Sequence, residues 1–256
     1  MIKFFRIIRK KLLMENKTSK YFKYAIGEIV LVVLGILIAL QINNWNENKK
    51  SKKQEKTYYC KISEDLQVDI INIDSSIVSV GERLKITEQL LKNLLKIQED
   101  KAVILKDFVA TFRSYQFVPT TAAITDITSS GKLEKFSNQN IKNRILNHYT
   151  KQESALKIIG INYNKHIDKI FSLESFADVG FQEIPQYQDI FDKELQGLLE
   201  STDWHKNPNE SIFIIIKDAM ILNMIIAQRE IELLNQIKND AVTLNDLLVP
   251  NCHSND

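Results

Sequence analysis

The stretch Ala25–Ile42, AIGEIVLVVLGILIALQI, decides the fold of this chain. Only Glu28 and Gln41 are polar within it, and residues 29–40 form an uninterrupted apolar run. At 1.5 Å of rise per residue, a helix of about 20 residues spans roughly 30 Å, the thickness of the hydrocarbon core of a bilayer. Because the run leaves no polar side for a helix of a soluble core, the sequence predicts a transmembrane helix over residues 24–44.

Aromatic and basic residues flank this helix. Tyr24 precedes the apolar stretch and Trp45 follows it, at the positions where amphipathic rings meet the headgroups. The predicted stub, residues 1–23, carries eight basic residues and one acidic residue, and the polar juxtamembrane stretch, residues 45–56, is also rich in lysine. A short basic N-terminus on an uncleaved signal anchor favours a cytoplasmic N-terminus in the inner membrane and an extracytoplasmic C-terminal domain.

The beginning of the stub has an amphipathic pattern. In MIKFFRIIRKKLL (Met1–Leu13), apolar and basic residues recur at helical spacing. This pattern predicts a short helix on a bilayer with anionic headgroups, while an unstructured basic tail remains the alternative.

The predicted anchor also carries a stripe of polar and small residues. At 100° per residue, Glu28, Gly35 and Ala39 fall within about 60° of one another. Such a stripe is typical of helix–helix contacts in membranes and is compatible with a homo-oligomer through this helix. The simpler alternative is that Glu28 extends to the lysine-rich surface. The predicted anchor residues are Tyr24, Ala25, Glu28, Gly35, Ala39, Gln41 and Trp45.

Two segments together resemble a known family. IKFFRIIRKKLL and the following KYFKYAIGEIVLVVLGILIALQINNWNENKK resemble the opening of the domain of unknown function 6090 family, which is frequent in Bacteroidota. ITSSGKLEKFSNQNIKNRILNHY (Ile127–Tyr149) is similar to the middle segment of that family. The resemblance implies a single-pass membrane anchor followed by a helical domain, and it supplies no activity, cofactor or catalytic residue.

The composition of the remaining chain points to helices. With 7 glycines and 4 prolines, the chain lacks the turn formers that an all-β sandwich, a Rossmann fold or a P-loop enzyme needs. Apolar residues recur at helical spacing over 59–94 and again over 141–170. The sequence therefore predicts an all-α fold: one N-terminal transmembrane helix, then an antiparallel helical bundle with two or three long helices over residues 57–250 and a tail over 251–256. A two-stranded coiled coil is the alternative for the first long helix.

Residues that end or begin helices divide the predicted bundle into separate helices. Shorter helices are expected over residues 102–115, 121–130 and 189–200, a long one over 139–172, and a loop over 177–188. Asn207-Pro208 is a start signal for a last helix that ends near Leu248, ahead of Pro250. Its apolar run 212–226 could be a second membrane span, but Lys217 and Asp218 interrupt it and favour a buried bundle helix.

The chain contains two cysteines, Cys60 and Cys252. If the first and last long helices lie antiparallel, these residues end near one another, and a disulfide would suit an exported domain. Two unpaired thiols are the preferred interpretation at this stage, with the bond as the alternative.

Motifs of known chemistry are missing from the sequence. There is no GxxxxGK[ST], GxGxxG, HExxH, CxxC or GxSxG. His148 and His166 would lie about 27 Å apart on one helix, too far to share a metal ion. Ser129 and Lys132 have the spacing of an SxxK motif but are better explained by a helix end. We therefore expect no cofactor, no metal site, no nucleic-acid partner and no enzymatic activity.

Two functions remain. The first is a membrane-anchored, non-catalytic interaction or assembly module that binds an unidentified protein partner. The second is an extracytoplasmic, sensor-like bundle that binds a ligand between its helices and acts with a partner subunit. A pocket of several hundred Å³ with convergent polar groups would favour the second.

Overall fold

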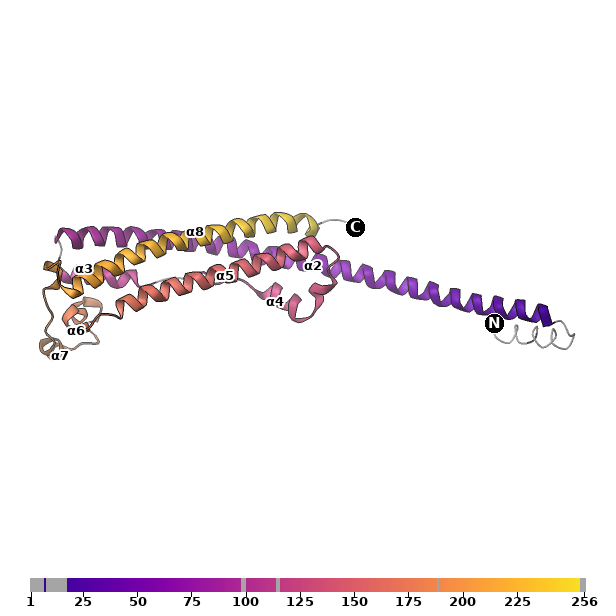
Figure 1. Ribbon diagram of the computed structural model, residues 1–256, viewed down its shortest axis with the longest axis horizontal. Helices are drawn as coiled ribbons and strands as arrows, with labels where there is room; N and C mark the ends of the chain where they lie inside the picture. Colours follow the sequence, from indigo (N-terminus) through magenta and orange to yellow (C-terminus); the bar gives the residue numbers. More distant parts are fainter. Residues whose placement is uncertain (1–6, 8–17, 98–99, 114–115, 188, 254–256) are drawn as a thin grey trace. The chain divides into compact units, whose positions relative to one another are not determined.

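The computed structural model describes residue 7 and residues 18–97, 100–113, 116–187 and 189–253. Within these residues the regular secondary structure is helical and no strand occurs, which confirms the predicted fold class (Figure 1). Most of the basic stub, including nearly all of the amphipathic helix predicted at the start of the chain, lies outside the described residues.

The chain divides into two compact units. One comprises Met1–Lys56 with Lys135–Ser137, and the other comprises Thr57–Glu134 with Asn138–Asp256. Helix α2 (Thr18–Lys96) supplies residues to both, so the predicted membrane helix and the first long bundle helix belong to one element.

Three long helices form the second unit. They are residues 57–96 of α2, α5 (Gln139–Ile170) and α8 (Ser211–His253). Ion pairs Asp74–Lys238 and Arg83–Glu230 join α2 to α8, and the residue numbers rise on one helix as they fall on the other. α8 is therefore antiparallel to α2, as the sequence predicts for the two longest bundle helices (Figure 1).

A broken segment leads from the end of α2 to the start of α5. It consists of α3 (Lys101–Thr111), an extended stretch, α4 (Ala122–Ser129) and the short helix η1 (Lys132–Lys135). Pro119 stands in the extended stretch, because proline and the residue before it resist the helical conformation. Asp69 and Asp65 on α2 accept hydrogen bonds from the backbone N–H groups of Thr120 and Ala123, at 2.8 and 2.9 Å. These carboxylates satisfy donors that the start of α4 leaves open.

Between α5 and α8 lies a cap built from short helices. They are α6 (Phe176–Val179), η2 (Phe181–Glu183), η3 (Pro185–Tyr187), α7 (Lys193–Leu198) and η4 (Trp204–Lys206). The fully buried Trp204 anchors the cap, and its indole N–H donates to the carbonyl of Val179 at 2.9 Å. A cluster of buried apolar side chains around Ile73, Leu233 and Ile237 forms the core in the middle of the bundle.

Several predicted boundaries are wrong. The helix expected over 102–115 ends at Thr111, and the one expected over 189–200 is limited to Lys193–Leu198. The stretch predicted as a loop over 177–188 contains most of the short helices of the cap. α8 begins at Ser211, because Asn207 closes a turn in which its carbonyl accepts from the N–H of Glu210 at 3.0 Å. α8 also continues past Leu248 to His253, since Pro250 lies in its last turn and removes only one backbone hydrogen bond there.

Candidate membrane anchor, disulfide and groove

The apolar stretch of α2 is exposed along its length. Its large apolar side chains between Ile26 and Ile42 are 46–63% exposed, and its most apolar 18-residue window is 0% buried. Soluble proteins rarely expose contiguous apolar patches larger than a few hundred Å². By length and composition this helix can cross a membrane.

The predicted anchor residues lie as follows. Tyr24 and Trp45 are exposed at the two ends of the apolar stretch, and the ammonium of Lys49 lies 5.5 Å from the centroid of the Trp45 ring. Ala25 and Glu28 are half-buried, and Gln41 is exposed. A Cβ added at Gly35 would meet no atom of the described residues within 4 Å. The stripe with Gly35 and Ala39 is thus sterically open to a second helix. Association of two such helices stays a prediction.

α8 is also long and apolar enough to cross a membrane, but it packs differently. A third of its most apolar window is buried. Asp218 pairs with Lys169 on α5 at 3.8 Å, and the buried Asn223 joins a polar network with α2, α3 and α5. These contacts suit a bundle helix.

Cys60 and Cys252 form a disulfide bond, with Sγ atoms 1.96 Å apart and Cα atoms 5.0 Å apart. The preferred sequence interpretation, two unpaired thiols, is therefore wrong. The antiparallel packing of α2 and α8 brings the residues together, and the continuation of α8 beyond Pro250 completes the approach. Ser63 and Asn245, a turn or two away, share a hydrogen bond of 2.6 Å that fixes the same register.

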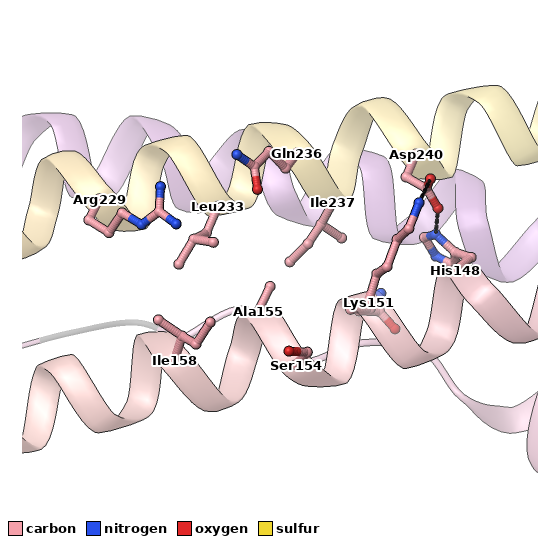
Figure 2. A pocket seen from close by; sticks show the side chains of 11 residues that line it. His148, Lys151, Ser154, Ala155, Ile158, Arg229, Leu233, Gln236, Ile237 and Asp240 are labelled. Atoms are coloured by element: carbon pink, nitrogen blue, oxygen red, sulfur yellow. Dashed lines mark hydrogen bonds and ion pairs between the residues drawn. The ribbon is translucent and has the colours of Figure 1, made fainter.

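A groove of about 470 Å³ opens between α5 and α8 (Figure 2). From α5 it is lined by His148, Lys151, Gln152, Ser154, Ala155 and Ile158. From α8 it is lined by Arg229, Leu233, Gln236, Ile237 and Asp240. Its apolar floor belongs to the buried cluster in the middle of the bundle.

Asp240 organises one end of the groove. One carboxylate oxygen lies 3.0 Å from Nδ1 of the buried His148, and the other accepts from Lys151 at 3.0 Å. Burial acts to raise the pKa of Asp240, but hydrogen bonds from Lys151 and His148 outweigh it and hold the pKa below its ordinary value. Burial lowers the pKa of His148 despite its bond to Asp240, so the imidazole is neutral at pH 7.

A buried polar network crosses the bundle nearer the cap. Arg83 and Glu230 form an ion pair between α2 and α8 in which both side chains are under a tenth exposed. Asn223 accepts from Thr87 at 3.4 Å and donates to Nε2 of His166 at 3.0 Å. Burial, assisted by the charge of Arg83, lowers the pKa of His166 to about 4.

The remaining sequence candidates have structural roles. Ser129 donates to the carbonyl of Asp126 at 3.3 Å, and Lys132 donates to the hydroxyl of Tyr58 at 2.9 Å, so each member of the SxxK pair serves another contact. Within the described ranges, no group of three or more His, Cys, Asp or Glu residues is arranged to hold a metal ion.

Sequence reasoning missed the groove. It treated His148 only as a metal candidate and did not single out Lys151, Arg229 or Asp240. The available signal was weak: His148 and Gln152 interrupt the apolar line of α5 one helical turn apart, at positions that face the rest of the bundle.

Comparison with family models identifies a family for this chain. A family model described as "Family of unknown function (DUF6090)" matches residues 28–181, more than half of the chain. No curated protein and no solved structure matches the chain.

Proposed function

The chain belongs to the DUF6090 family, a family of unknown function, and we propose that it is a membrane-anchored helical module that presents an interaction surface to a protein partner. The observation that carries the membrane anchor in this proposal is the apolar window of α2, of which no residue is buried. Contact between such an apolar surface and water is unfavourable, and the hydrocarbon core of a bilayer would remove that contact.

The disulfide supports the orientation that we propose. Disulfides persist in oxidising compartments and are rare in the cytosol. We infer that the chain crosses the inner membrane once, with the basic N-terminus against anionic headgroups in the cytoplasm and the bundle outside. The open stripe at Gly35 and Ala39 further suits self-association of the anchor.

We infer no catalytic role, nucleic-acid partner or cofactor. Three of the acidic and histidine side chains of the bundle are engaged in structural hydrogen bonds: the half-buried Asp65 and the buried Asp69 hold the start of α4, and His166 bonds to Asn223. A catalytic acid or base would have to reach a substrate in a cleft.

A second candidate function is ligand binding by the bundle, acting with a partner subunit. The groove between α5 and α8 favours it, because its volume falls within the range of small-molecule sites and polar side chains converge on an apolar floor.

Thiol labelling of the full-length chain in intact cells tests the proposed location. We expect a maleimide to add no mass before reduction and two adducts after it, because both thiols are held in the disulfide. In spheroplasts of the Cys252→Ser variant, a membrane-impermeant maleimide should label Cys60, which is partly exposed.

The Cys60→Ser/Cys252→Ser double variant is the control, since it offers no thiol and should stay unlabelled in every condition. Two adducts on the wild-type chain without reduction would place the bundle in a reducing compartment and contradict the proposal.

A further inference from the structure

The groove between α5 and α8 has more free hydrogen-bond donors than acceptors. Its one carboxylate, Asp240, is occupied by His148 and Lys151. Within the described part of the chain, the only partner of the Arg229 guanidinium is Glu232, one turn away on the same helix. A guanidinium has five N–H donors, so most of those of Arg229 are available to a ligand.

The competing ion pair of Arg229 is weak. Both Arg229 and Glu232 are 47% exposed, and exposed pairs three residues apart on a helix contribute little to stability. In Figure 2 the guanidinium of Arg229 extends along α8 toward Leu233, at the end of the groove opposite Asp240. An anionic group seated there would gain a bidentate partner without breaking a buried contact.

The space between these two ends is apolar. Leu233 and Ile237 project from α8 toward Ala155 and Ile158 on α5 (Figure 2). The side chains of Ser154 and Gln236, at the rim, make no hydrogen bond with any described residue. The site is thus an apolar trough that has the Lys151–Asp240 pair at one end and the weakly paired guanidinium of Arg229 at the other.

We propose that this groove binds a single-chain anionic amphiphile, with its tail between Leu233 and Ala155 and its carboxylate or phosphate on Arg229. The volume of about 470 Å³ lies toward the low end of small-molecule sites and suits one chain. The inference rests on the second candidate function, ligand binding by the bundle, and adds the chemical class of the ligand.

Photolabelling tests the proposal on the full-length chain in phosphatidylcholine nanodiscs. The probe is dodecanoate with a diazirine in its tail, and the matched probe has the same tail with a trimethylammonium head. We expect the carboxylate probe to label peptides that contain residues 154–158 and 229–237, at least about tenfold more than the ammonium probe, because one charge-assisted contact is worth about that factor.

Three variants separate the parts of the site. Arg229→Gln should lower labelling about tenfold, while Lys157→Gln, which removes an exposed charge of α5 outside the groove, should leave it unchanged. Ser154→Trp keeps every charge but fills the trough, and it should abolish labelling. Because Ser154 is exposed and forms no hydrogen bond with a described residue, this variant is expected to fold.

The outcomes are distinguishable. Equal labelling by the two probes would overturn the inferred ligand class and leave ligand binding standing. Labelling of neither α5 nor α8 would overturn both, while the membrane-module proposal would still be judged by thiol labelling. Competition by phosphatidylglycerol added to the nanodiscs would identify a membrane lipid as the source of the anionic amphiphile, and no competition would identify a free amphiphile. Either result supports the inferred chemistry.

Discussion

Removal of the disulfide should lower the free energy of unfolding of the bundle by about 2–5 kcal/mol. The bond joins residues 192 positions apart, and the chain-entropy model gives an upper value of about 5 kcal/mol for a loop of that size. We therefore expect the Cys60→Ser/Cys252→Ser double variant to unfold at a clearly lower urea concentration than the oxidised wild-type chain.

The measurement is urea unfolding in nanodiscs, followed by the fluorescence of the buried Trp204 in a Trp45→Phe background. Reductant supplies the matched control: it should bring the wild-type chain to the stability of the double variant and leave the double variant unchanged. Equal stability of the oxidised chain and the double variant would show that the packing of α2 against α8 holds the register without the bond.

Lowering the pH from 7.5 toward 4 should destabilise the bundle by about 3 kcal/mol through His166 alone. The folded chain holds the pKa of His166 at about 4, below the ordinary value of 6.5. Between these values the unfolded chain binds a proton at His166 and the folded chain does not, so the stability is fully present above pH 6.5 and is lost as the pH falls.

The hydrogen bonds around His166 also predict that its protonation destabilises the folded chain. Asn223 donates through its amide nitrogen to the carbonyl of Thr111 at 3.2 Å, so the same nitrogen faces Nε2 of His166 as a donor. Protonation of Nε2 would set two donors against each other beside the charge of Arg83. The pKa values of His148 and His205 are also lowered by burial, so they add to the trend.

Unfolding at pH 7.5 and at pH 5.0 checks this expectation. The difference between the two pH values should shrink in the His166→Gln variant, and comparing each protein with itself cancels the packing cost of the substitution. A difference as large in the variant as in the wild-type chain would assign the pH dependence to other groups.

Periodicity and caps predicted the elements of the fold that are decided locally. The unbroken apolar run identified the exposed part of α2, and the apolar line from Ile141 to Ile170 identified α5, which Asn138 caps by accepting from the N–H of Ile141. Most of the cap between α5 and α8 was not predictable in this way, because α6, η2, η3 and η4 have only three or four residues each, too few to show a period. Only α7 lies within a helix that the sequence predicts, over 189–200.

The disulfide and the groove depend on which helices pair. Cys60 and Cys252 meet only when α2 and α8 adopt one register, and the walls of the groove come from stretches about 80 residues apart. Local patterns carry no information about that pairing, so Lys151, Arg229 and Asp240 looked like ordinary residues of solvated helix faces.

Extraction of membranes at alkaline pH tests the anchor most directly. Membranes from cells that express the full-length chain are washed with carbonate at about pH 11, which releases peripheral proteins, and the pellet is then treated with detergent. We predict that the chain stays in the pellet until detergent is added, whereas a Leu34→Arg/Leu37→Arg variant, with about 5–7 kcal/mol of added insertion cost, moves to the soluble fraction. Recovery of the wild-type chain as a monodisperse protein without detergent would contradict the account.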